Sequence, residues 1–353
     1  MKKRTYKDLL ICIAGALGAF LFFFFPAPCL KSSQAGPISI DLHPYGFPAE
    51  LPIDEKIGVF YLSADRLAVF FNNKQPLSGP GSEAFQLIVL DISGHGLAQR
   101  NVLAAPKAMD LTPGPNGRIL FGRSGQLDFF DSGLHLLKTV PLGDSVTGIS
   151  FNRRLNQLVE MTIDDVSQTR TAHFLDGDSL EENLSLTYPL ESAPHFGDKQ
   201  LAYTRGGNCF GSARIVSVRK DDWAFLSDLP ACDFLTFIGN DEIAYAFDQR
   251  LYVVDRSGKQ IMKARIPVLG SFSEPGFVGI SDNYQRLAIA ALTKNIFFPA
   301  WAWPNEIFVY DLKTKRRIFN HTLPINSWAS ALSPEGHQLA AIENGILKLI
   351  PIP

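Results

Sequence analysis

The side chains that most often carry chemistry are thinly spread in this sequence. Its seven histidines and four cysteines lack the close spacing of a metal site. His195 is the best placed histidine, since it falls in a predicted inner strand beside Phe196, although a hydrogen-bonded structural histidine explains it better. No nucleophile elbow, P-loop or dinucleotide-binding motif occurs. The sequence therefore predicts no catalytic residue, no metal and no cofactor.

Two of the cysteines have positions that favour a disulfide. Cys209 and Cys232 fall in two connections that we expect at the same face of the fold, and an oxidising compartment would let them pair. Such a bond would close a loop of about 24 residues and contribute roughly 3 kcal/mol. Two free buried thiols explain the same positions, so both interpretations stay open.

Aromatic residues gather in one segment that could bind a ligand or a partner. Residues 294–305 hold Phe297, Phe298, Trp301 and Trp303, and a shorter glycine-rich segment around Asn208 is expected on the same face. Exposed aromatic side chains would form a patch for a protein, a sugar ring or a lipid headgroup. Folded back, they would cover the protein's own core instead. We predict these five residues as a binding surface.

The body of the chain is a repeat, and the repeat determines where these side chains lie. After residue 30 short apolar runs alternate with turn residues, which is the pattern of an all-β protein. An apolar strand, a polar turn and a second apolar strand recur seven times at intervals of 39 to 52 residues. The first apolar residues of the second strands are Leu67, Ile119, Leu158, Leu201, Ile243, Leu287 and Leu339.

A third and a fourth strand complete each unit. Five third strands end in an aspartate, which can accept backbone N–H groups and fix a tight turn. Four strands at this period, seven times over, predict a seven-bladed β-propeller across residues 54–353. The last unit has three strands, so we expect residues 37–42 to pair with it as its outer strand and close the ring. The turn aspartates are Asp91, Asp131, Asp176, Asp255 and Asp311.

The N-terminus predicts a hydrophobic helix that acts as a membrane segment or as an export signal. Residues 1–8 hold four basic side chains, and the uncharged residues 9–30 are long enough to span a bilayer. A signal anchor would stay as a single-pass transmembrane helix, whereas a signal peptide cleaved near Ala35 would leave a secreted or periplasmic protein. Both place residues 1–8 in the cytoplasm and the propeller outside it. Residues 31–53 contain four prolines and are predicted to be a tether that includes the closure strand.

Two segments carry a resemblance to a known class of propeller. Residues 310–314 (YDLKT) and 331–336 (ALSPEG) resemble a blade junction of bacterial WD-repeat-like β-propeller proteins. The resemblance covers roughly residues 37–353 and is architectural, because the Gly-His and Trp-Asp signatures of true WD repeats are missing. Propellers of this kind serve as protein-binding platforms, as sugar or lactone enzymes and as quinone-dependent dehydrogenases, so the resemblance implies a fold more than an activity.

The net charge and the composition of the predicted inner strands limit the classes of function that fit this sequence. A net charge of −2 argues against a nucleic-acid partner. The predicted inner strands are poor in carboxylates, which favours binding over chemistry. We expect a membrane-tethered, extracytoplasmic propeller that binds an unknown protein or small ligand on its loop face, with residues 9–30 in the membrane. The alternatives are a hydrolase or lactonase with a site in the central channel, and a sensor ectodomain.

Overall fold

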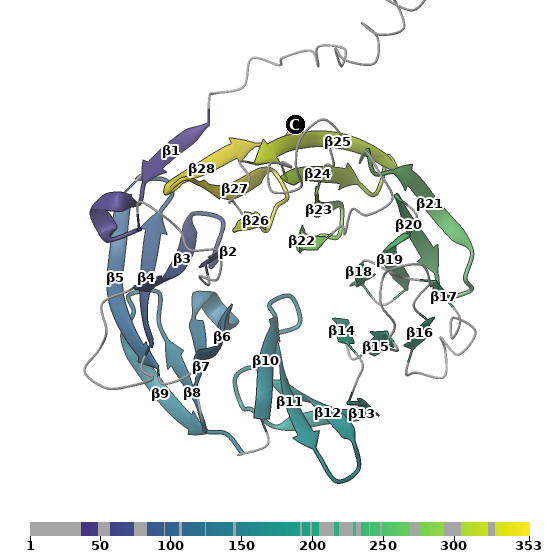
Figure 1. Ribbon diagram of the computed structural model, residues 1–353, viewed down its shortest axis with the longest axis horizontal. Helices are drawn as coiled ribbons and strands as arrows, with labels where there is room; N and C mark the ends of the chain where they lie inside the picture. The colour runs from purple at the N-terminus through teal and green to yellow at the C-terminus, as the bar shows by residue number, and fades with distance from the viewer. Residues whose placement is uncertain are drawn as a thin grey trace, which may run out of the picture. The chain divides into compact units, whose positions relative to one another are not determined.

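The structure is a computed structural model in which one compact unit, Pro37–Pro353, is a ring of β-sheets (Figure 1). The structure describes residues 37–48, 57–73, 83–94, 96–105, 108–123, 125–143, 146–190, 193–197, 200–204, 215–218, 229–230, 234–239, 241–247, 249–267, 276–292, 305–323 and 329–353. Within these ranges the chain forms seven four-stranded antiparallel sheets. We number the sheets 1 to 7 in the chain order of their inner strands.

Six blades are continuous runs of four strands, and each runs outward from the axis to the rim. Sheet 1 consists of β2 (Ile57–Tyr61), β3 (Arg66–Asn73), β4 (Glu83–Asp91) and β5 (Gly96–Ala105). Sheet 2 consists of β6 (Ala108–Pro113), β7 (Ile119–Arg123), β8 (Gln126–Phe130) and β9 (Leu136–Pro141). Sheet 3 consists of β10 (Val146–Asn152), β11 (Gln157–Asp164), β12 (Thr169–Asp176) and β13 (Glu182–Pro189). Sheet 4 consists of β14 (Ala193–Gly197), β15 (Gln200–Thr204), β16 (Ile215–Val218) and β17 (Leu229–Pro230). Sheet 5 consists of β18 (Phe234–Ile238), β19 (Glu242–Phe247), β20 (Arg250–Asp255) and β21 (Gln260–Arg265). Sheet 6 consists of β22 (Gly276–Ile280), β23 (Arg286–Leu292), β24 (Asn305–Asp311) and β25 (Arg316–Leu323).

Sheet 7 is composite, because both ends of the described chain contribute to it. It contains β26 (Ser330–Leu332), β27 (Gln338–Glu343) and β28 (Ile346–Pro351), with β1 (Ile38–Asp41) as the outer strand. β1 runs antiparallel to β28, with Ile38 opposite Leu349 and Asp41 opposite Ile346. Ile40 and Leu42 are buried in a cluster that joins sheets 7 and 1. The two ends of the chain therefore close the ring at its rim.

The fold class expected from the sequence, seven blades preceded by an N-terminal hydrophobic helix, is wrong, because the described residues form six continuous blades, one composite sheet and no α-helix. The described residues form strands and two short 3-10 turns, η1 (His43–Tyr45) and η2 (Pro115–Gly117), and no α-helix. No helix in this part of the chain is long and apolar enough to cross a membrane. Residues 9–30, for which the helix is predicted, lie outside the described residues. The observed fold is an all-β propeller of six continuous blades and one composite sheet.

The repeat seen in the sequence corresponds to the buried layer of the ring. The first apolar residue of each of the seven second strands is at most 1% exposed. Each lies opposite the last or the next-to-last residue of its inner strand, as Leu67 does opposite Tyr61 and Leu158 opposite Phe151. A strand whose neighbours all bury apolar side chains is stabilised by those contacts, at about 25 cal/mol per Å² of apolar area removed from water. The sheets therefore stack face to face around the axis.

The aspartates at the ends of the third strands hold the outer turns, as predicted. Asp131 Oδ1 accepts the backbone N–H groups of Gly133 at 2.8 Å and His135 at 2.9 Å. Asp91, Asp176, Asp255 and Asp311 make equivalent bonds within their own turns. Hydrogen bonds to a carboxylate favour its charged form, and the pKa of each of the five is lowered. These residues are structural and form no catalytic pair.

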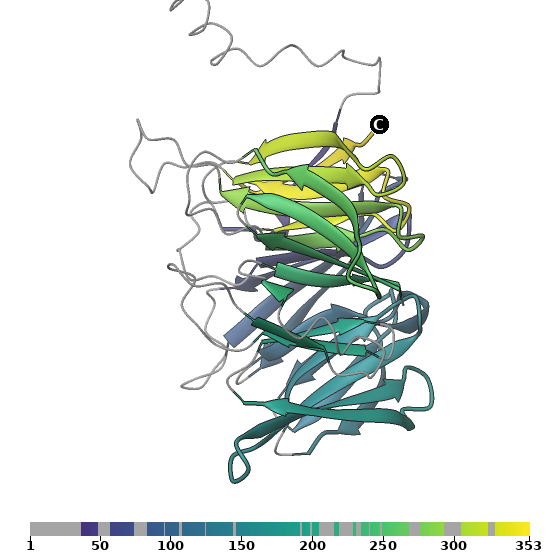
Figure 2. The same cartoon turned by 90° about the vertical axis from the view of Figure 1, so that its right-hand side faces the viewer.

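A basic residue at the start of the second strand, or just before it, connects neighbouring sheets in three blades. Arg66 of sheet 1 donates to Ser132 Oγ of sheet 2 at 2.5 Å, and Arg118 of sheet 2 approaches Asp178 of sheet 3 to 3.4 Å. Arg286 of sheet 6 donates to the carbonyl of Gly336 in sheet 7 at 3.0 Å. The basic residue of the sequence repeat therefore reaches the next blade from the turn between first and second strands. Figure 2 shows the ring from the side, with the turns of the sheets at its two faces.

Candidate functional site: an arginine-lined cavity on the axis

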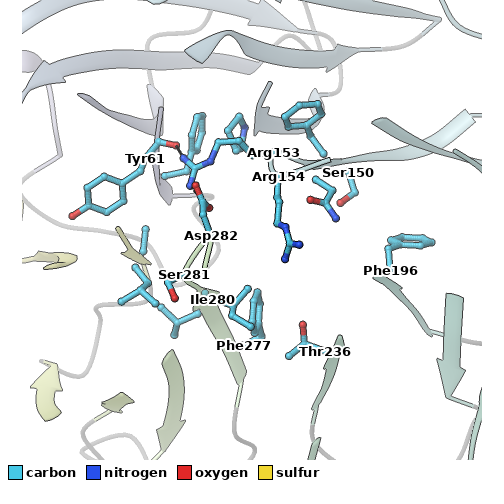
Figure 3. Close-up of a pocket in the computed structure, with 18 of the residues that line it drawn as sticks. Tyr61, Ser150, Arg153, Arg154, Phe196, Thr236, Phe277, Ile280, Ser281 and Asp282 are labelled. Atoms are coloured by element: carbon cyan, nitrogen blue, oxygen red, sulfur yellow. Dashed lines mark hydrogen bonds and ion pairs between the residues drawn. The ribbon is translucent and has the colours of Figure 1, made fainter. Parts of the chain in front are cut away.

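A cavity of about 360 Å³ lies on the axis of the ring. All seven inner strands contribute to its wall, from Tyr61 in β2 to Ala331 in β26. The turn between β10 and β11 and the turn between β22 and β23 contribute Arg153, Arg154 and Asp282 at one end. Figure 3 shows the Arg153 side chain beside Asp282, and the Arg154 side chain extending toward the middle of the cavity. The cavity therefore opens at the face of the turns between first and second strands.

Arg153 bridges three sheets across this end of the channel. Its Nη2 lies 2.8 Å from Asp282 Oδ1 of sheet 6, and its Nη1 donates to the carbonyl of Tyr61 in sheet 1 at 3.3 Å. Its Nε is buried and has no hydrogen-bond partner among the described residues. The Arg153 and Asp282 side chains are 27% and 47% exposed, so solvent screens their attraction. The guanidinium is nevertheless fixed in place by a carboxylate and a carbonyl from opposite sides.

The bridge continues into sheet 7 through two further hydrogen bonds. The Tyr61 hydroxyl donates to Gln338 Oε1 at 3.1 Å, and the backbone N–H of Asp282 donates to the carbonyl of Pro334 at 2.8 Å. Burial raises the pKa of Tyr61, so its hydroxyl stays protonated and acts as a donor. Sheets 7, 1, 3 and 6 are thus linked by a closed circuit of hydrogen bonds at this end of the channel.

Arg154 has a different environment from its neighbour. Its guanidinium carbon lies 4.2 Å from the centre of the Tyr284 ring, within the range of a cation–π contact. The side chain is exposed and points into the open part of the cavity (Figure 3). No carboxylate among the described residues forms an ion pair with it. Arg154 therefore presents an accessible cation inside a pocket.

The remaining wall is largely apolar, with a few hydroxyl groups. Phe277 is 48% exposed and lies with Phe196 along the same cavity as Ile280. Ser150 of β10 and Thr236 of β18 add hydroxyl groups to the wall, and Thr236 lies beside Phe277 (Figure 3). Pockets that bind small molecules have this composition, in which apolar walls surround a small number of placed polar groups.

The structure does not describe the binding and disulfide residues predicted from the sequence. Phe297, Phe298, Trp301, Trp303 and Asn208 all fall outside the described residues, as do Cys209 and Cys232. The turns that line the cavity join first and second strands, whereas the aromatic segment connects β23, which ends at Leu292, with β24, which begins at Asn305. Leu292 and Asn305 are paired at the far end of sheet 6 from the turn that carries Asp282. The binding surface and the disulfide stay predictions.

His195 lies in β14, the inner strand of sheet 4, where the sequence predicted it. It is half-buried and pairs in register with Ala202. Its neighbour Phe196 lines the axial cavity. Within the described part of the lining, Asp282 is the acidic side chain, and it is paired with Arg153. These residues supply no observation in favour of the hydrolase alternative.

Sequence reasoning missed the two arginines, although one signal marked them. The segment from Asn152 to Asn156 departs from the turn pattern of the other units, with two consecutive arginines and no glycine or aspartate. This difference can be recognised only when the turn is compared with the corresponding turns of the other units. Even so, the sequence could not show that this turn points into the channel, because the direction of a turn depends on its contacts with sheets 1 and 6.

Comparisons with known proteins support the fold and nothing more specific. No family model and no curated protein matches the chain. A chain in a crystal structure of the mitotic checkpoint complex is similar at 15% identity, covering 93% of this chain and 97% of that one with a TM-score of 0.52. Kluyveromyces lactis Hsv2 is similar at 13% identity over 83% of this chain and 91% of its own, with a TM-score of 0.49. At this identity the first likeness shows a shared propeller fold, while the bacterial WD-repeat-like resemblance stays a prediction.

Proposed function

We propose that this protein is a binding module whose ligand site is the axial cavity. The observation that carries the proposal is a cavity walled by all seven sheets, with exposed Phe277 and exposed Arg154 facing the same space. A rigid ring with concave, mixed apolar and polar lining is suited to binding, because little conformational entropy is lost when a ligand enters. A protein partner on the aromatic segment 294–305 is a second, independent contact in this proposal.

Ligand-dependent stabilisation of the folded state tests the proposal. A ligand that binds only the native protein raises its melting temperature, so the full chain is screened by thermal shift against a panel of small organic molecules. The Thr236→Trp variant fills the cavity, and Thr322→Trp places the same side chain on exposed residue 322 of the outer strand β25. Hits should stabilise the native protein and Thr322→Trp but not Thr236→Trp. Hits that ignore the filled cavity would argue against the site.

The proposed module is tethered to a membrane and lies outside the cytoplasm. The support is in the sequence, where four basic side chains in residues 1–8 precede the uncharged residues 9–30, and the basic flank of such a segment stays inside. A carbonate wash of membranes should leave the protein in the pellet, and protease added to intact cells or spheroplasts should digest the propeller. Release by carbonate would instead indicate a cleaved signal, and protection from protease would contradict the proposed side.

A further inference from the structure

Among the described residues that line the axial cavity, one cation has no counter-charge. The charged side chains of the described lining are Arg153, Arg154 and Asp282. Asp282 Oδ1 forms an ion pair with Arg153 Nη2 at 2.8 Å, and the Arg153 guanidinium also donates to the Tyr61 carbonyl. Arg154 contacts Tyr284 through its ring. The described lining therefore carries a surplus of one positive charge, located on Arg154.

The N–H groups of Arg154 have no hydrogen-bond partner among the residues that the structure describes. A guanidinium has five N–H donors in a planar fork that matches a carboxylate. The contact with the Tyr284 ring involves the face of a π system and takes up no hydrogen-bond acceptor. Arg153 fixes the turn on one side and Tyr284 supports Arg154 on the other, so the fork is held in place before a ligand arrives. Such preorganisation lowers the entropic cost of binding.

The wall opposite the guanidinium determines what the rest of the ligand must be. Phe277 exposes 48% of its surface, and Phe196 and Ile280 extend the apolar wall. A volume of about 360 Å³ is near the lower end of small-molecule pockets, which span roughly 300–1,000 Å³. One surplus charge fits a monoanion, because a dianion would bring an uncompensated negative charge close to Asp282.

We propose that the axial cavity binds a small organic monocarboxylate with an apolar body, whose carboxylate pairs with Arg154 and whose body packs against Phe277. The proposal rests on the function proposed above and specifies the ligand class of the same site. It involves binding alone and no covalent step.

Titration of the full chain with matched probes tests this assignment. Phenylacetate is the probe, phenylacetamide is its neutral isostere, and inorganic phosphate is an anion without an apolar body. Phenylacetate should bind at least about tenfold more tightly than either, since charge-assisted hydrogen bonds to a carboxylate are roughly twice as strong as neutral ones. The Arg154→Gln variant should lose this preference, and Arg154→Lys should recover part of it. Arg118→Gln is the control, because Arg118 lies in another inner turn and pairs with Asp178 at the surface.

Each outcome has a distinct meaning. Equal affinity for phenylacetate and phenylacetamide, phosphate binding as tight as phenylacetate binding, or an unchanged Arg154→Gln variant would overturn the monocarboxylate assignment. Tight binding of a peptide through its free C-terminal carboxylate, with no binding of phenylacetate, would overturn it in favour of a protein ligand. If phenylacetamide binds the native protein and not Thr236→Trp, the cavity remains a binding site and only the ligand class fails. If no ligand distinguishes native protein from Thr236→Trp, the proposed function itself fails.

Discussion

The ring is held together in different ways at its rim and at its axis. At the rim, β1 pairs with β28 along Ile38–Asp41, so backbone hydrogen bonds close the circle. At the axis, the single side chain of Arg153 connects sheet 3 with sheets 1 and 6. The rim contact repeats the strand pairing found within every sheet. The axial contact depends on one residue and on where its turn points.

This difference explains why the two contacts should respond differently to mutation. A strand ladder combines backbone bonds with burial of apolar side chains, and Leu42 next to β1 is fully buried. The Arg153 contact is a partly exposed ion pair with one additional bond to a carbonyl, and such contacts contribute less than a buried strand does. We therefore expect the rim to dominate stability and the axis to dominate the shape of the cavity.

Deletion of residues 37–42 should have the largest effect. The deletion removes the whole of β1 together with the buried side chains of Ile40 and Leu42. For a domain of this size we expect the melting temperature to fall by roughly 5–10 °C. Deletion of residues 31–36 is the matched control, since it removes the same length of chain and leaves β1 in place. Equal melting temperatures for the two deletions would show that β1 does not close the ring.

Replacing Arg153 should lower stability less than the deletion of residues 37–42 does, and the size of its effect should depend on Asp282. Arg153→Met removes the ion pair and the bond to Tyr61, for an expected loss of about 1–2 kcal/mol after allowance for solvent screening. Asp282→Asn should cost less, because it leaves the carbonyl contact intact. Denaturant titration of both single variants and the double variant measures the coupling energy. Strictly additive effects would contradict the cross-channel bridge.

The rim was predictable from the sequence for a physical reason. Counting strands in the last unit shows one missing, and Ile38, Ile40 and Leu42 alternate as a half-buried strand requires. The turn aspartates were predictable as well, because their hydrogen bonds are local. Local patterns and the count of strands together determine the sheets.

The axis was not predictable, because its contacts join residues far apart in the chain. Arg153 and Asp282 are separated by 129 positions, and nothing in either turn specifies the other. The repeat showed that the turn at Asn152 is irregular, yet the irregularity has no meaning until sheets 1, 3 and 6 are arranged around one channel. The same reason explains why the sequence favoured aromatic segments over Arg154 as a site.

A buried charge cluster near the composite sheet offers a pH-dependent test of the rim. Glu343 of β27 accepts a hydrogen bond from His321 of β25 at 2.7 Å and pairs with Lys348 of β28. Burial acts to raise the pKa of Glu343, but the hydrogen bonds from His321 and Lys348 outweigh it, so the pKa is lowered. A lowered folded-state pKa gives stability that is present above the unfolded value and is lost as pH falls through the folded value.

Glu343→Gln should therefore reduce the fall in melting temperature that acid causes. Between pH 6 and pH 3.5 the melting temperature of the native protein should fall by about 2–3 °C more than that of the variant. Thermal unfolding followed by circular dichroism across this range measures the difference. Glu335→Gln is a suitable control, because Glu335 is exposed in the neighbouring turn of sheet 7. Identical pH profiles for the native protein and Glu343→Gln would show that this charge cluster does not stabilise the rim.

The smallest effect is expected at the outer turns, where each aspartate serves only its own blade. The Ser257 hydroxyl is the main cause of the lowered pKa of Asp255, which also accepts backbone N–H groups of Ser257 and Lys259. Asp255→Ala should lower the melting temperature by about 1 °C, with the difference vanishing as pH falls and the native carboxylate becomes protonated. Asp165→Ala, at an exposed turn position, should change nothing. A larger loss at Asp255 than at Arg153 would mean that local turns, rather than contacts across the channel, set the order of stability inside the ring.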